Sequence, residues 1–250
     1  MIHYSICAEC DDNNPNGTFN ELIWARGEVN SDLYAFCKCE KGHITISGLM
    51  TDLFNVLYNS AVDAYLKECF SESVMSFAAS LERAYELFLK VILIKKEFSF
   101  SEIEEFWKEI KNQSERQYGA FCVSYLAETK TIWAIDKSMI EFRNKVIHKG
   151  YLASSKEVEN YAEYITKNLS QICKVMKENL ADERLKYFFL LAESNKSPIA
   201  EILKEYPQAK FTSISNPSLI EWNDSENAIV TFEIALKRFK HNKLLVGLDI

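Results

Sequence analysis

Apolar residues recur at the spacing of an α-helix through the middle of the chain, and this repeat constrains the fold most. Between residues 74 and 92 they fall at positions i, i+3, i+4 and i+7, which places them on one face of a helix. The residues on this face are Val74, Phe77, Ala78, Leu81, Tyr85, Phe88, Leu89 and Ile92. With only seven glycines and four prolines in 250 residues, few positions interrupt helices. The sequence therefore predicts a mainly α protein.

The helical period extends to both sides of this repeat. A helix is expected over residues 53–64, with a break near Ser71 before the long repeat begins. Ser101 and Glu104 have capping-box spacing, so a third helix is expected to begin at Ser101. A fourth helix is expected over residues 116–129.

Two more helices complete the predicted bundle. The segment 137–148 has the helical period and is followed by Gly150, a residue that commonly ends helices. Ser154 and Glu157 form a second capping-box signature, which predicts a long helix from there to about residue 176. We therefore expect residues 48–180 to form a helical bundle.

The two ends of the chain differ from this bundle. Residues 1–47 contain four of the seven cysteines and a turn-rich run, and short alternating pieces there suit β-strands. This segment is predicted to be a small β zinc-ribbon-like module. Residues 181–250 form a C-terminal extension of unknown role. Within it, residues 228–239 fit a strand or a helix, and helix is favoured because Asp224–Asn227 resembles an N-terminal cap.

Cysteine spacing in the N-terminal module predicts a metal site. Cys7 and Cys10 are separated by two residues, and Cys39 and His43 bracket a short turn, which is how paired knuckles hold tetrahedral zinc. We favour Cys7, Cys10, Cys39 and His43 as ligands. A set that includes Cys37 is the main alternative. Four protein ligands leave no open position, so the expected cofactor is a structural Zn²⁺.

The net charge and the first residues of the chain indicate the compartment and the partners to expect for the protein. The formal net charge is −7, so the molecule as a whole does not attract a polyanion such as RNA, and any nucleic-acid contact must be local. The first residues lack a signal-peptide pattern, and no apolar run approaches the ~18 residues of a membrane span. We therefore expect a cytoplasmic protein without a membrane partner.

Arg143, Asn144 and His148 lie together at the end of the predicted helix 137–148, beside Lys145 and Lys149. Cleavage of RNA without metal requires an acid/base near neutral pKa to act on the 2′-hydroxyl and the leaving oxygen. It also requires fixed positive charge near the phosphorane. Imidazole and guanidinium meet these two needs.

Arg143-Asn144-x3-His148, placed in a helical bundle, resembles the Arg-x4-6-His motif of the HEPN superfamily (higher eukaryotes and prokaryotes nucleotide-binding domain). The resemblance covers about residues 50–180. It implies a homodimer whose two motifs face one cleft and act as a metal-independent endoribonuclease, often in phage defence or toxin–antitoxin systems. It also implies that His148 is the acid/base, that Arg143 binds phosphate and that Asn144 orients phosphate or His148 through its amide. Lys145 and Lys149 are candidates for flanking phosphates.

Several alternatives remain at this point. Residues i and i+5 of a helix lie about 140° apart, so Arg143 and His148 of one chain diverge unless the helix ends between them or a partner chain contributes. Arg143 can instead pair with a bundle glutamate such as Glu82 or Glu86, while His148 stabilises the helix C-terminus. The bundle is then a non-catalytic module that binds RNA or nucleotide or serves as a scaffold. In a third hypothesis the zinc module is an adaptor and the bundle only dimerises. An antitoxin or another regulatory protein is a further expected partner.

Overall fold

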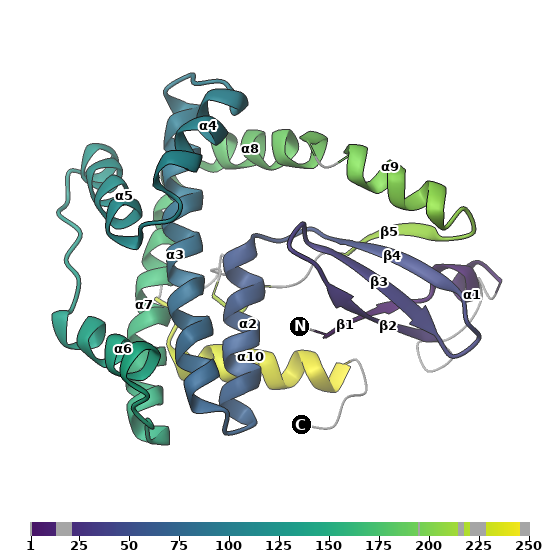
Figure 1. Ribbon diagram of the computed structural model, residues 1–250, viewed down its shortest axis with the longest axis horizontal. Coiled ribbons are helices and arrows are strands. Elements are labelled where there is room, and N and C mark those ends of the chain that lie inside the picture. Colours follow the sequence, from purple (N-terminus) through teal and green to yellow (C-terminus); the bar gives the residue numbers. More distant parts are fainter. Residues whose placement is uncertain (1, 14–21, 195, 215–217, 221–228, 246–250) are drawn as a thin grey trace. The chain divides into compact units, whose positions relative to one another are not determined.

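The computed structural model describes residues 2–13, 22–194, 196–214, 218–220 and 229–245. The chain divides into two compact units: Met1–Asp52 with Ala192–Ser218, and Leu53–Leu191 with Leu219–Ile250. The first unit contains a β-sheet and the second is helical, so the described chain is mainly α with a small N-terminal sheet, as the sequence predicts (Figure 1).

The helical unit is built around one long helix, α3 (Phe70–Lys95) (Figure 1). This helix packs against α2, α5, α6 and α7, while α10 packs against α7 and α2. The bounds of the surrounding helices are α2 Leu53–Leu66, α4 Phe100–Ile110, α5 Ser114–Thr129, α6 Lys137–Lys149, α7 Ser155–Asn179, α8 Ala181–Ser194 and α10 Phe232–Leu245.

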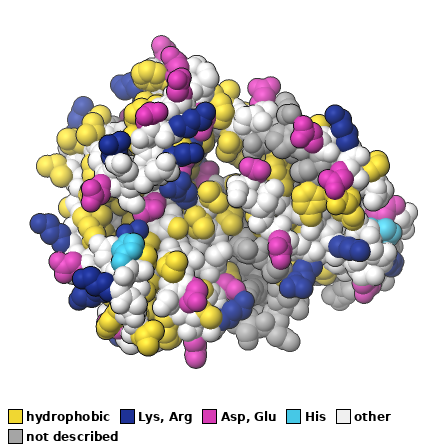
Figure 2. Space-filling view, viewed as in Figure 1, with side chains coloured by type: hydrophobic (Ala, Val, Ile, Leu, Met, Phe, Trp, Pro, Cys, Tyr) yellow, Lys and Arg dark blue, Asp and Glu magenta, His cyan; other side chains and the backbone are white. Residues whose placement is uncertain are grey.

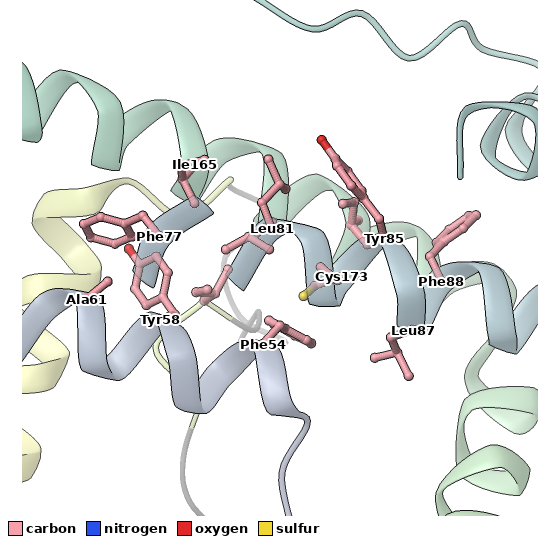
Figure 3. Packing of buried hydrophobic residues seen from close by; sticks show 14 of the residues in the cluster. Phe54, Tyr58, Ala61, Phe77, Leu81, Tyr85, Leu87, Phe88, Ile165 and Cys173 are labelled. Carbon is pink, nitrogen blue, oxygen red and sulfur yellow. The ribbon is translucent and has the colours of Figure 1, made fainter. Parts of the chain in front are cut away.

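The apolar face of α3 forms the centre of the helical core. All eight residues of the predicted stripe are buried, which confirms that the 3.6-residue period reflects packing. Tyr58 of α2 and Phe77 of α3 meet edge to face with ring centroids 5.2 Å apart, close to Ile165 of α7 (Figure 3). The Tyr58 hydroxyl is also satisfied, because it lies 2.5 Å from the Thr166 hydroxyl. Each large side chain fully buried here contributes roughly 1.5–3 kcal/mol.

Helix ends follow the local sequence signals, with one correction. Ser154 and Glu157 form the predicted capping box at the start of α7. The predicted box of Ser101 and Glu104 is wrong: Ser99 caps α4 and its reciprocal partner is Glu102. Because the sequence Ser99-Phe-Ser-Glu-Ile-Glu contains both frames, spacing alone does not choose between them. Glu104 instead accepts a hydrogen bond from Lys90 at 2.6 Å.

The sheet unit is a four-stranded antiparallel meander with one added strand. Its order is β1-β2-β3-β4-β5, and β5 pairs parallel to β4. The strands are β1 Ile2–Ile6, β2 Trp24–Val29, β3 Tyr34–Cys39, β4 Ile44–Leu49 and β5 Lys210–Ile214, with helices α1 Ala8–Asp12 and α9 Lys196–Glu205. The expected strands at 34–39 and 43–46 correspond to β3 and β4.

The stretch after residue 180 contributes to both units. Strand β5, which sequence patterns did not indicate, extends the N-terminal sheet. The segment that fitted a strand or a helix forms α10, so the favoured helix is confirmed from Phe232 onward. The cap expected at Asp224–Asn227 lies outside the described residues. Among the helices that are described, none is both long enough and apolar enough to cross a membrane.

Candidate functional site

The sheet unit brings the four favoured metal ligands together from two local structures. Cys7 directly precedes the short helix α1 and Cys10 lies within it. Cys39 ends β3, and His43 is the last residue before β4. The turn between them closes with hydrogen bonds from the Cys39 N–H to the His43 carbonyl (3.1 Å) and from the Gly42 N–H to the Cys39 carbonyl (2.9 Å). Gly42 has φ +84°, a conformation that favours glycine.

The four candidate ligand atoms lie close enough together to hold one metal ion. One atom from each of Cys7, Cys10, Cys39 and His43 lies within 4.8 Å of all the others. The His43 Nδ1 atom is 3.2 Å from the Cys10 sulfur and 3.9 Å from the Cys7 sulfur. Tetrahedral coordination with zinc bond lengths separates sulfur and nitrogen ligands by about 3.5 Å, so the donor set fits an ion of this size.

Burial and charge at the cluster suit a bound cation. Cys7, Cys10 and Cys39 are at most 7% exposed. Burial, together with the adjoining sulfurs of Cys7 and Cys39, raises the pKa of Cys10 to about 11. Burial also opposes ionisation of Cys39, but hydrogen bonds from the His43 N–H and from Cys7 outweigh it and lower the pKa of Cys39. Several thiolates therefore disfavour one another here unless a cation neutralises them.

Cys37 is not a member of this cluster, although it lies two residues from Cys39 on the same strand. Its thiol is fully buried, and burial raises its pKa, an effect partly offset by the neighbouring hydroxyls of Ser5 and Ser47. The ligand set that the structure gathers is therefore the favoured one, and the alternative set that includes Cys37 is not formed.

Sequence reasoning missed the residues that surround the ligands. The Lys210 ammonium of β5 lies 2.7 Å from a Glu9 carboxylate oxygen and 2.6 Å from one of Asp12. The Thr45 hydroxyl accepts a hydrogen bond from the Ala8 N–H at 3.3 Å. Lys210 is far from α1 in the sequence, and no local pattern signals a pairing over such a separation.

The Arg143 motif lies on helix α6 of the other unit. Asp136 caps this helix by accepting a hydrogen bond from the Ser138 N–H at 2.8 Å. The helix ends at Gly150, whose φ is +65° and whose N–H donates to the Lys145 carbonyl. The predicted stop at Gly150 is thus confirmed. Because the helix continues through Lys149, Arg143 and His148 keep the angular separation of residues i and i+5.

The structure joins Arg143 to Asn144 and to α3. The guanidinium donates from Nη1 to the Asn144 Oδ1 at 3.0 Å and from Nη2 to Glu82 at 3.1 Å. The side chains of this ion pair are 25% and 28% exposed. Glu86, the other glutamate weighed as a partner, instead pairs with Arg83 at 2.6 Å and Lys90 at 2.9 Å.

The rest of the motif faces outward. Lys145, His148 and Lys149 are exposed, whereas Val146 between them is buried. Within the described part of the chain, no hydrogen bond connects His148 to Arg143 or Asn144. On the face shown in Figure 2, basic and acidic side chains are interspersed and do not segregate by sign. In one chain, therefore, the Arg143 side chain is held by hydrogen bonds, and the exposed His148 imidazole lies apart from it.

No model of a protein family matches the chain, and searches of curated proteins and of solved structures also give no match.

Proposed function

We propose that the helical unit is a metal-independent endoribonuclease of the HEPN type whose active cleft forms between two copies of the chain. The observation that carries this proposal is the arrangement at the end of α6. Glu82 and Asn144 fix the Arg143 guanidinium while it remains partly exposed, and His148 is exposed on the same helix. These groups are those needed for RNA cleavage at neutral pH.

In this proposal each group has a distinct chemical role. His148 takes the proton of the ribose 2′-hydroxyl or donates one to the leaving 5′-oxygen. Arg143 stabilises the charge on the phosphorane, because its fork of N–H donors matches phosphate oxygens. Asn144 fixes the orientation of Arg143, and the exposed Lys145 and Lys149 contact flanking phosphates.

The proposed dimer follows from the helix geometry. Arg143 and His148 diverge by about 140° around α6, so a cleft that presents both to one phosphate is best made with the motif of a second copy. The net charge of −7 opposes indiscriminate binding of RNA. We therefore also propose control by a regulatory partner such as an antitoxin, and a role in phage defence.

The test compares His148→Ala with His241→Ala, which removes an exposed histidine of α10. Cleavage of total cellular RNA is measured with EDTA present, and the molar mass of each variant is measured by light scattering. The His148 variant is expected to remain dimeric and to lose about 100-fold or more of the cleavage rate. The His241 variant should keep it. Equal rates for wild type and the His148 variant would contradict the catalytic assignment.

A non-catalytic role is the second candidate, and the Arg143–Glu82 ion pair favours it. An arginine that only fastens α6 to α3 makes this contact without touching RNA. In that case the wild-type protein binds RNA or nucleotide without cutting it. Arg143→Gln would then lower the free energy of unfolding and leave the products of an RNA assay unchanged.

For the sheet unit we propose that the ion is Zn²⁺ and that its role is structural. Three thiolates and one imidazole are a zinc donor set, and four protein ligands leave no position for substrate. The apolar cluster that contains the three cysteine ligands also includes Cys37, Ala25 and Ala35, with Ile23 and Val29 at its edge. So small a core gains most of its stability from metal.

Elemental analysis of two variants tests this assignment. Wild-type protein and Cys37→Ser should each contain one zinc per chain, because Cys37 is outside the cluster. Cys10→Ser should contain far less. Zinc retained by the Cys10 variant, or lost from the Cys37 variant alone, would overturn the ligand set.

A further inference from the structure

We infer that Lys210 is a positioning residue of the metal site, so that metal binding and the docking of strand β5 favour each other. This inference rests on the proposed zinc site but not on the proposed ribonuclease. It extends the site to a strand more than 160 residues away in the sequence from any of the four ligands.

Lys210 connects β5 to the helix that carries Cys10. Its ammonium lies between Glu9 (2.7 Å) and Asp12 (2.6 Å), which flank Cys10 on α1. Cys10 is buried at the cluster, while the two carboxylates reach Lys210. One short helix therefore contacts the metal ligands and β5 at the same time.

A second connection runs through β4. In the parallel ladder Lys210 is aligned with Thr45, which follows His43 by two residues. The Thr45 hydroxyl accepts from the Ala8 N–H at the start of α1. The contacts therefore form a closed circuit. His43 precedes β4, β4 pairs with β5, and Lys210 of β5 contacts α1. Cys10 of α1 belongs to the same cluster as His43. Constraint of one part of such a circuit restricts the others.

Helix α1 depends on this circuit because it is weak alone. It has five residues, and no side-chain hydrogen bond caps its N-terminus. Helices this short are not stable in water by themselves. Metal coordination by Cys7 and Cys10 would hold the helix in the arrangement in which Glu9 and Asp12 both lie opposite Lys210.

Charge provides the reverse effect. A divalent ion with three thiolates and one imidazole has one net negative charge, and Glu9 and Asp12 add two more beside it. Lys210 is a cation placed against this group, so it favours the metal-loaded state. By linkage, the factor by which metal favours β5 docking equals the factor by which β5 docking favours metal.

Other contacts limit the size of the coupling. Phe211 of β5 packs against Tyr34 with ring centroids 6.3 Å apart, and the ladder to β4 remains in either state. The ion pairs themselves are partly exposed, with Lys210 37% exposed. We therefore expect β5 to open more often without metal and not to detach fully.

The experiment uses the full chain and two readouts. Zinc affinity is measured by competition with a chromophoric chelator for wild type, Lys210→Met and Lys210→Arg. Lys237→Met is the matched control, since Lys237 also forms a 2.7 Å pair with a glutamate but lies in the other unit. We expect Lys210→Met to weaken zinc binding about fivefold, whereas Lys210→Arg and Lys237→Met stay close to wild type.

Hydrogen exchange of residues 210–214 is the second readout. Removal of zinc from the wild type should speed exchange there about fivefold, and Lys210→Met should show a smaller response. In a Glu9→Gln/Asp12→Asn background, Lys210→Met should change zinc affinity much less, because only the charge of the metal group itself then remains for Lys210 to act on. The inference is overturned if Lys210→Met has the zinc affinity of the wild type and if hydrogen exchange at residues 210–214 does not change when zinc is removed. A wild-type protein that binds no zinc overturns the metal proposal itself.

Discussion

At the scale of single residues, Arg143 has the contacts of a structural ion pair and the free donors of a phosphate-binding group. Its contacts to Glu82 and Asn144 each use one N–H, and a guanidinium has five. The sequence named Glu82 and Glu86 as equal candidates for this pair. Glu86 is held by Arg83 and Lys90, three and four residues away on the same helix, a spacing that the sequence already contains. The approach of Arg143 to Glu82 joins residues 61 positions apart, so no local pattern signals it.

A double-mutant cycle of Glu82→Gln and Arg143→Gln measures the structural part of this pair. Both side chains are more than a fifth exposed, so the coupling in urea unfolding is expected to be about 0.5–1 kcal/mol. Loss of RNA cleavage in Arg143→Gln should be far larger than this coupling explains. A coupling of several kcal/mol would instead assign Arg143 mainly to the fold.

Lys90 is a buried cation on α3, and its ion pairs lead to a prediction about how stability depends on pH. Its side chain is 6% exposed, 2.9 Å from Glu86 and 2.6 Å from Glu104. Burial lowers its pKa, but Tyr187, Glu86 and Glu104 outweigh burial, so the net shift is upward from 10.5. Lys90→Met is expected to lower the free energy of unfolding by about 2 kcal/mol. The loss is smaller than for a fully buried ion pair, because Glu104 is partly exposed.

The sign of the shift fixes the pH window. A pKa raised by folding gives stability that is complete below the unfolded value of 10.5 and is lost as pH rises through the folded value. The stability difference between wild type and Lys90→Met in urea should therefore stay constant from pH 7 to 9 and shrink above pH 10.5. Lys95→Met, at a more exposed pair, is the control. A difference that shrinks between pH 7 and 9 would contradict this account.

At the scale of helices and strands, the sequence predicted those features that depend on contacts between residues close together in the chain. The capping box at Ser154 and the stop at Gly150 depend on residues a few positions apart, and both are confirmed. The clustering of Cys7, Cys10, Cys39 and His43 was predicted for the same reason, because each of the two pairs lies in a short segment. Strand β5 was not predicted, because its partner β4 lies more than 160 residues earlier and edge pairing leaves little trace in composition.

Two glycines with the same space around them should respond oppositely to alanine. A Cβ at Gly150 or at Gly119 meets no atom within 4 Å. Gly150 has φ +65°, where alanine is strained, so Gly150→Ala should lower the free energy of unfolding by about 1 kcal/mol. Gly119 lies inside α5, so Gly119→Ala should raise it by about 0.5–1 kcal/mol. Urea denaturation checks both, and equal signs would refute the backbone explanation.

At the scale of the whole molecule, the two units differ in how they are stabilised. The helical unit has a continuous apolar core that includes Phe77, Phe88 and Leu169. The ligand-containing cluster of the sheet unit has mainly cysteines and alanines. The periodicity of residues 53–176 predicted the core of the helical unit, because the apolar residues of an amphipathic helix mark the face that is buried. It did not predict that segments after residue 180 contribute to both units.

If zinc occupies the cluster of Cys7, Cys10, Cys39 and His43 as proposed, its removal should act on the sheet unit alone. With a strong chelator present, hydrogen exchange is expected to accelerate in β2, β3 and β4, because the proposed ligands Cys39 and His43 join β3 to β4, and β2 pairs with β3. Exchange in α3 should remain slow, since its stripe packs in a core without metal ligands. Helical circular dichroism should change little. If α3 loses protection in parallel with the sheet, the two units unfold as one cooperative system, and zinc stabilises the entire chain.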